Sequence, residues 1–183
     1  MKIIFFFSLF FFLLQNSGYT SSKDNIVKKL NSIDNLSFNF IQTIGDKDEE
    51  GECIIQYPKK IFCKYTKKNN KIIVSNGTSL VIKNNQQYYR YPMKSTPFEF
   101  ILDKQFLINK INSSKLNEFQ EKYLFIQIFE NNNNINVFFS KKNFNLVGWQ
   151  VEDIYQNLAV TYIFDTTINK NIDEKIFKLP LND

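Results

Sequence analysis

The chain has 183 residues, 23 Lys or Arg against 18 Asp or Glu, a net charge of +5 and no histidine. Without histidine it lacks the usual general base and the commonest transition-metal ligand, and it has no Gly-rich phosphate loop, so most enzyme classes and a metal site are disfavoured. Its basic residues alternate with acids and Asn, which argues against nucleic-acid binding.

A basic start and a long apolar run open the chain. One lysine precedes Ile3–Leu14, and the polar stretch Gln15–Gly18 follows. This order predicts a secretory signal peptide over residues 1–18, cut near its end. The run is shorter than the roughly 20 residues of a spanning helix; an uncleaved anchor or a buried first helix are the alternatives. No cysteine stands directly after the run, so the lipid-attachment pattern of a bacterial lipoprotein is missing. We therefore expect an exported protein that is not tethered to a membrane, with one domain over residues 19–183.

The first predicted element of that domain is a short amphipathic helix. Ser22 is the expected N-cap and Asp24 suits the first turn. Ile26, Leu30 and Ile33 share one face, and the helix should end near residue 32.

After this helix the apolar period changes to two, which predicts strands. The predicted strands are Leu36–Gln42, Glu52–Tyr57, Ile61–Tyr65, Lys71–Ser75, Thr78–Ile82, Gln87–Tyr91, Tyr123–Phe129, Ile135–Ser140, Leu146–Asp153, Leu158–Asp165 and an edge strand at Lys175–Leu179. Asn76-Gly77 is the strongest hairpin signal among the turns.

Helical signals interrupt the strands once. Thr96 and Pro97 are typical of an N-cap and a first helical residue. Leu107–Ile111 either continues this helix or begins a second one. The helix has an apolar stripe at Phe98, Ile101, Leu102 and Phe106.

Carboxylates offer little for catalysis. Asp48–Glu50 falls in a predicted polar loop, and Glu152 and Asp153 alternate along a predicted strand, so the latter two point to opposite faces. We therefore expect no catalytic residue and no enzyme. An exported esterase is the alternative, although the nucleophile-elbow pattern is missing.

A long antiparallel meander curls, and short amphipathic helices are stable only when packed, so we expect helices laid as a lid on the inner face of a curved sheet. The space between lid and sheet is either a dry core or an apolar cavity.

Local signals then follow one another in an order that resembles the LolA family of lipoprotein carriers over nearly the whole mature chain. In the first half these are Phe40-x-Gln42, Gly51 and Pro58, Cys63-Lys64-Tyr65, Ile73-Val74-Ser75-Asn76-Gly77 with Leu80, Tyr91-Pro92-Met93 and Thr96-Pro97. In the second half they are Trp149-x-x-x-Asp153, Val160-x-Tyr162-x-Phe164, Asn169 and Ile176-Phe177-x-Leu179-Pro180.

The resemblance implies a mainly β (α+β) fold, an incomplete antiparallel β-barrel with a helical lid over an apolar cavity. It also implies a periplasmic, monomeric carrier without cofactor. Such a carrier receives acylated lipoproteins from an ABC transporter in the inner membrane and delivers them to a LolB-like acceptor at the outer membrane. A carrier or sensor of another lipid or amphiphile, and a structural protein with a dry core, are the alternatives.

The expected lipid-binding residues come from both layers, and a one-residue shift would exchange the faces of a strand. On the sheet side they are Phe38, Phe40, Ile55, Tyr65, Leu80, Ile82, Trp149, Tyr162 and Phe164. On the lid side they are Ile26, Leu30, Pro97, Phe98, Ile101 and Leu102.

The chain departs from the family at three places. Tyr57 stands where some members have an arginine implicated in holding the lid, Cys63 replaces a frequent aromatic residue, and the sequence ends three residues after Pro180. Pairing the strands around Pro58 places Cys53 opposite Cys63 on the inner face, so we expect a disulfide between them. Two small buried apolar residues are the alternative.

Overall fold

The computed structural model describes residues 21–66, 70–152 and 157–181. The predicted signal peptide over residues 1–18 lies outside these ranges. In the described part of the chain, no helix is both long and apolar enough to cross a membrane.

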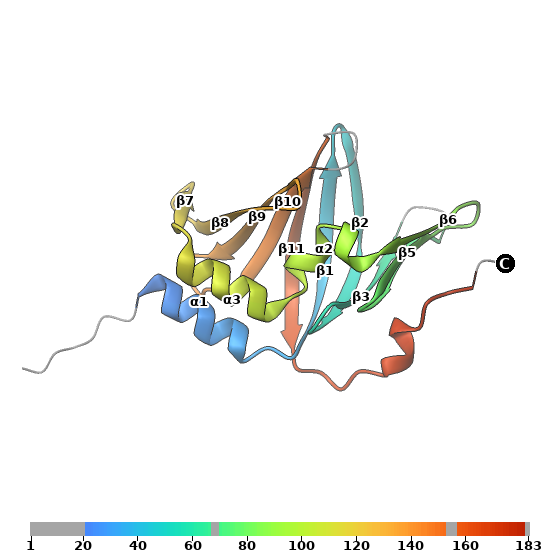
Figure 1. Cartoon of the computed structure of the whole chain (residues 1–183), viewed down its shortest axis with the longest axis horizontal. Coiled ribbons are helices and arrows are strands. Elements are labelled where there is room, and N and C mark those ends of the chain that lie inside the picture. Colours follow the sequence, from blue (N-terminus) through green and yellow to red (C-terminus); the bar gives the residue numbers. More distant parts are fainter. Residues whose placement is uncertain (1–20, 67–69, 153–156, 182–183) are drawn as a thin grey trace, which may run out of the picture.

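The described strands form one antiparallel sheet in the order β6-β5-β4-β3-β2-β1-β11-β10-β9-β8-β7 (Figure 1). Their bounds are β1 Asn35–Ile44, β2 Lys47–Gln56, β3 Lys60–Tyr65, β4 Ile72–Asn76, β5 Ser79–Lys83, β6 Tyr88–Pro92, β7 Asn117–Phe119, β8 Tyr123–Glu130, β9 Asn133–Ser140, β10 Leu146–Glu152 and β11 Leu158–Ile168.

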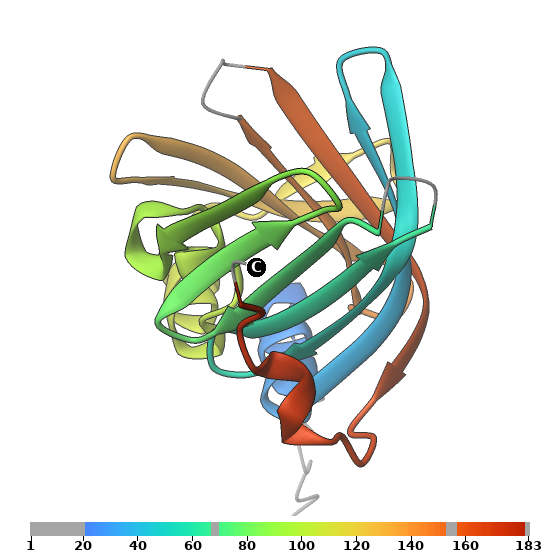
Figure 2. The same ribbon diagram turned by 90° about the vertical axis from the view of Figure 1, so that its right-hand side faces the viewer.

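The sheet curves without closing (Figure 2). Its two halves meet where β1 pairs with β11, while β6 and β7 remain its two edges. This confirms the predicted incomplete barrel. The strong curvature follows from the right-handed twist accumulated over many strands.

Among the described residues, three α-helices lie on one face of the sheet: α1 (Ser22–Asn31), α2 (Phe98–Ile101) and α3 (Lys104–Ser113) (Figure 1). A 3-10 turn, η1 (Met93–Ser95), leads into α2.

Two capping predictions were wrong. Ser21, not Ser22, caps α1, because its hydroxyl accepts from the Asp24 amide at the N3 position and completes a capping box.

Around α2, Pro97 precedes the helix as its N-cap, and Thr96 makes no cap bond, because its Oγ1 donates to the Met93 carbonyl instead. Of the two possibilities left open after α2, a second helix is correct. α3 begins after Asp103, whose side chain accepts from the Phe106 amide at 3.0 Å.

Asp48–Glu50 lies in β2 and not in a loop. β1 and β2 form a long hairpin whose tight turn passes through Gly45 at φ +56°, so the strand extends well before residue 52. The acidic residues of β2 gave no apolar alternation to mark it. The three-residue β7 was likewise not predicted.

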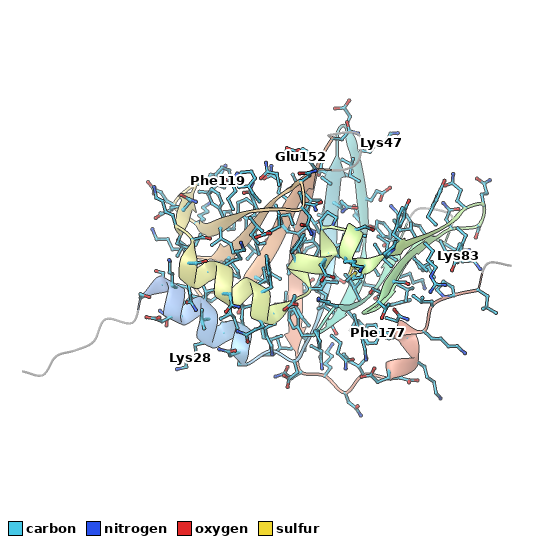
Figure 3. The ribbon with its side chains drawn as sticks, in the orientation of Figure 1. Lys28, Lys47, Lys83, Phe119, Glu152 and Phe177 are labelled. Atoms are coloured by element: carbon cyan, nitrogen blue, oxygen red, sulfur yellow. A yellow bond between two sulfur atoms is a disulfide. The ribbon has the colours of Figure 1, made fainter. Side chains whose placement is uncertain are left out.

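The C-terminal segment is a strap across the outer face, not an edge strand. Residues 170–181 carry the 3-10 turn η2 (Glu174–Phe177), which lies against β3 and β4. Figure 2 shows this strap in front of the strands with α1 behind them, and Figure 3 marks Phe177 where η2 meets the sheet. Phe177, Val74 and Val81 are buried there, which makes a small second core outside the sheet.

Candidate functional site

The candidate site is the interface between the inner face of the sheet and the three lid helices. Trp149 on β10 connects the two layers, because its ring lies 6.2 Å from that of Phe38 on β1 and 6.4 Å from that of Phe98 on α2, both edge-on. Phe40 packs edge-on against Tyr65 at 5.0 Å. Edge-to-face pairs are a favourable arrangement of aromatic rings.

Most of the predicted lining residues lie in this interface. One buried cluster contains Phe38, Phe40, Ile55, Tyr65, Leu80 and Trp149 of the sheet and Ile26, Leu30, Ile101 and Leu102 of the lid. Ile82 and Phe98 are half-buried against the same cluster. Pro97 is half-buried at the start of α2.

Tyr162 and Phe164 were assigned to the wrong face of β11. Tyr162 is 47% exposed and stacks on Phe164 on the outer face, whereas Ile163 is buried in the cluster. The pairing explains the difference. Inward on β11, Thr161 lies opposite Trp149 and Ile163 opposite Phe40, so the large rings of the neighbouring strands leave room only for smaller side chains.

Sequence reasoning also missed a large part of the inner face. β8 and β9 were predicted as strands, yet their inward residues were not assigned, although they alternate with period two. These are Leu124, Ile126, Ile128, Ile135, Val137 and Phe139. On the lid, Met93, Phe100, Leu107, Ile108 and Ile111 belong to the same cluster.

The lid is fastened to the β2–β3 turn by Lys59. Its Nζ lies 2.6 Å from Glu99 Oε1 and 3.3 Å from Asp103 Oδ2, and its backbone amide donates to the Leu102 carbonyl at 2.8 Å. The hydrogen bond to Glu99 raises the pKa of Lys59 above its usual range against the opposing effect of burial, so the ammonium is charged at neutral pH. We call this arrangement the Lys59 latch.

Tyr57, which the resemblance places where some family members have an arginine, is half-buried beside the cluster, and the Lys104 ammonium lies 5.7 Å from its ring centre. Burial raises the pKa of Tyr57 well above its usual range. Lys59 was not predicted as a lid contact. The sequence contained one signal for this contact: a lysine follows Pro58, and two acids four residues apart, at positions 99 and 103, could lie on one face of the lid.

Hydrogen bonds also join the other helices. Lys23 Nζ on α1 donates to the Ser114 carbonyl beyond α3 at 2.6 Å, and Lys104 Nζ donates to the Ile33 carbonyl at 2.9 Å. These bonds span segments far apart in the sequence, so α1 and α3 are held as one layer.

One end of the inner face is polar. The Tyr65 hydroxyl donates to Gln42 Oε1 at 3.1 Å, and Gln42 Nε2 donates to Thr161 Oγ1 at 3.0 Å. Lys71 pairs with the buried Glu49 at 2.6 Å and lies 4.0 Å from the Tyr65 ring centre. Burial, aided by Glu49, raises the pKa of Tyr65, so its hydroxyl remains a donor.

Cys53 and Cys63 form a disulfide between directly opposed residues of β2 and β3, with their Cα atoms 4.1 Å apart. Both are buried in the inner cluster. The predicted bridge and its placement on the inner face are confirmed. Within the described residues, no group of three or more Cys, Asp or Glu side chains is arranged to hold a metal ion.

Comparisons with known proteins bear on this arrangement. The family described as outer membrane lipoprotein carrier protein LolA matches residues 31–180. An uncharacterized conserved protein from Thermus thermophilus has a similar structure, with a TM-score of 0.53 at 9% identity over 89% of this chain and 96% of that chain. This likeness supports the fold alone.

Two further solved structures are more distant. A LolA superfamily protein from Nitrosomonas europaea has a TM-score of 0.45 at 11% identity, covering 87% of this chain and 98% of its own. Lipoprotein LppX from Mycobacterium tuberculosis has a TM-score of 0.43 at 7% identity, covering 83% and 96%. No curated protein matches the sequence.

Proposed function

The chain belongs to the LolA family of outer membrane lipoprotein carrier proteins, and from this premise we propose that it is a periplasmic carrier that shields the acyl chains of lipoproteins. In this proposal it receives them from an ABC transporter in the inner membrane and delivers them to a LolB-like acceptor. The observation that carries the proposal is the apolar interface between the sheet and a lid of separate short helices, latched at Lys59.

The chemistry of the cargo explains why such an interface would serve. Each acyl CH₂ removed from water contributes about 0.8 kcal/mol, so a lipid chain of ordinary length cannot stay unshielded in an aqueous compartment. The inner face offers aromatic and aliphatic side chains once the lid moves away. Short helices gain their stability from packing on the sheet, so an acyl chain can replace their contacts with contacts of the same kind.

Binding and release need no covalent chemistry in this scheme. The carrier acts as a container and not as an enzyme, and the energy for loading comes from the transporter. The latch consists of partly exposed ion pairs, which contribute about 1 kcal/mol or less each. A latch of that strength can open on contact with a partner.

A carrier for another lipid or amphiphile is the second candidate, because an apolar interface does not select among acyl chains. The polar end of the inner face, with Gln42, Tyr65 and Lys71, would then meet a different head group.

Mass spectrometry of species that co-purify with the protein from its native periplasm tests the proposal. We expect acylated lipoproteins on the wild type. We expect them to be lost from Leu102→Glu, which puts a charge at a fully buried lid position, and retained by Leu181→Glu, which changes a residue that is 76% exposed. Because Leu102→Glu could unfold the protein, Phe98→Glu at a half-buried position is the second variant, and circular dichroism reports folding.

Free lipids without lipoprotein would favour the second candidate. A protein that carries neither lipoprotein nor lipid would contradict both. The mass of the mature N-terminus in the same preparation tests export, because removal of a signal peptide would leave a chain that begins near residue 19.

A further inference from the structure

One edge of the sheet ends beside the lid. β6 pairs with β5 on one side, and no described strand pairs with its other side. The strand continues directly into η1, which contacts α2. In Figure 1, β5 and β6 project from the sheet as a hairpin. A chain laid along the free edge of β6 would therefore reach the start of the lid.

Hydrogen bonds at both ends of this hairpin fix which backbone groups point outward. The Met93 amide donates to the Thr78 carbonyl at 2.9 Å, and the Asn84 amide donates to the Gln87 carbonyl at 3.0 Å. Bonded and non-bonded pairs alternate along an antiparallel ladder. Met93 and Gln87 are an even number of residues apart, so both bonds belong to the same set of hydrogen-bonded pairs. The residues of β6 between these pairs, at every second position, therefore turn their N–H and C=O groups away from β5.

By this alternation the N–H and C=O groups of Tyr88 and Arg90 point to the free edge. Pro92 occupies the next outward position. The N–H group that proline lacks would point away from β5 there, so no hydrogen bond between β5 and β6 is lost. An open edge with regularly spaced donors and acceptors is a template for another strand.

The side chains of β6 add an aromatic surface on the lid side. Tyr89 and Tyr91 lie opposite Ile82 and Leu80, on the face that forms the inner cluster. Their rings stack 6.5 Å apart at an interplanar angle of 20°, and they are 44% and 39% exposed. This tyrosine pair extends the apolar interior to the edge of the sheet.

The charge of this region is one-sided. Residues 53–98 contain nine Lys or Arg and no Asp or Glu, while the rest of the chain has 14 basic and 18 acidic residues. Lys59, Lys60 and Lys71 are paired with acids from other segments. Arg90 and Lys94 are exposed in and just after β6, and Arg90 Nη2 donates to Ser79 Oγ. An acidic ligand complements such a surface.

We propose that the free edge of β6 is a strand-addition site for an extended, acidic segment of the cargo polypeptide, the segment next to its acylated residue. The proposal rests on the carrier function. Acyl chains held under the lid require the attached polypeptide to leave at the margin of the interior, and β6 lies at that margin. Main-chain pairing tolerates many sequences, while Arg90 and Lys94 favour acidic ones.

Three synthetic diacylated peptides test the proposal with the full mature protein. One has a short linker rich in Asp, one has Lys at the same positions, and one is the Asp peptide with N-methyl groups on alternate residues, which removes the strand hydrogen bonds and keeps the charge. The readouts are the dissociation constant and the hydrogen exchange of the Tyr88 and Arg90 amides.

We expect the Asp peptide to protect both amides and to bind about fivefold more tightly than the Lys and N-methylated peptides. The double variant Arg90→Glu/Lys94→Glu should reverse the charge preference. The matched variant Lys122→Glu/Lys142→Glu, with the same charge change at two exposed turns, should not.

Equal binding of all three peptides with unprotected β6 amides would overturn the strand-addition site and leave the carrier function intact. Failure of every diacylated peptide to bind would contradict the carrier function itself, and the proposal with it.

Discussion

Gly51 shows how a single residue sets the packing of the inner face. A Cβ built on Gly51 would lie 2.2 Å from the Lys64 carbonyl oxygen and 2.8 Å from the Phe40 ring. The ring therefore lies across the glycine, where it meets Tyr65 edge-on. Gly51 is one of the residues on which the resemblance to the family was based, and its role here is to admit an aromatic ring close to the backbone.

We expect Gly51→Ala to lower the free energy of unfolding by about 2 kcal/mol, because an added methyl must displace backbone or a packed ring. Chemical denaturation measures the change. Gly45→Asn is the control, since no atom lies within 4 Å of the Cβ position and Asn tolerates its positive φ. A Gly51→Ala protein as stable as the wild type would contradict the close packing.

The disulfide offers a second test at this scale. Replacing both Cys53 and Cys63 by Ala should lower the free energy of unfolding by about 2 to 3 kcal/mol, because the unfolded chain regains the freedom that a closed loop of this size removes. Denaturation of the double variant and of the wild type, with and without reductant, measures it. Reductant should destabilise the wild type and leave the variant unchanged; an effect on both would point to another cause.

Pairing across strands also marks how far the sequence could predict side-chain positions. Cys53 and Cys63 were predictable because a short turn fixes the register on both sides of it. The faces of β11 were not, since both alternating sets of that strand contain apolar residues. Only contact with Phe40, from a strand distant in the sequence, and with Trp149 of the neighbouring strand β10 decides which set turns inward.

At the scale of elements, the strap shows a segment whose role depends on the fold around it. Its apolar residues resemble an edge strand in sequence, yet the Asp173 side chain accepts from the Lys175 amide and starts a 3-10 turn. Lys60 Nζ then bonds Glu174 at 2.6 Å on the outer face, and Lys83 Nζ donates to the Leu181 carbonyl at 2.8 Å. No local pattern predicts where a terminal segment docks.

We expect Phe177→Ala to lower the free energy of unfolding by about 3 kcal/mol, because it removes a buried ring from the small outer core beside Val74 and Val81. Leu181→Ala, at a residue that is 76% exposed, should change stability by less than about 0.5 kcal/mol. Thermal denaturation of both variants measures the difference. Equal stability of the two would show that the strap contributes little to the fold.

The helices were also predictable only in part. Their existence followed from the spacing of apolar residues and from capping residues, whereas the boundary between α2 and α3 required Asp103 to be recognised as a cap. The contact of Lys59 with that same boundary belongs to tertiary structure, because 40 residues separate it from Glu99.

For the whole molecule, the proposed carrier function makes the lid and the cargo compete for one apolar surface. In the closed form the inner face is already covered by Leu102, Ile101 and the other lid residues of the cluster. The apparent affinity for an acyl chain therefore equals the affinity of the open form multiplied by the fraction of molecules that are open. Any contact that exists only in the closed form therefore lowers the apparent affinity for the acyl chain, even if it does not touch that chain.

The Lys59 latch is such a contact, so we expect Lys59→Met to bind a fluorescent fatty acid about fivefold more tightly than the wild type, the effect of losing about 1 kcal/mol of closed-state stabilisation. Lys60→Met is the matched control, because Lys60 pairs with Glu174 on the strap and not with the lid. Amide exchange in α2 should be faster in Lys59→Met alone.

The pH dependence has a definite sign. The folded pKa of Lys59 lies above its usual range, so the charge on this lysine contributes its full stabilisation of the closed form at neutral pH, and that contribution is lost as the pH rises through the folded pKa. Weaker binding by Lys59→Met would mean that the lysine supports the open, loaded form. Tighter binding with slower transfer to an acceptor would mean that latch strength sets the balance between holding a lipid and releasing it.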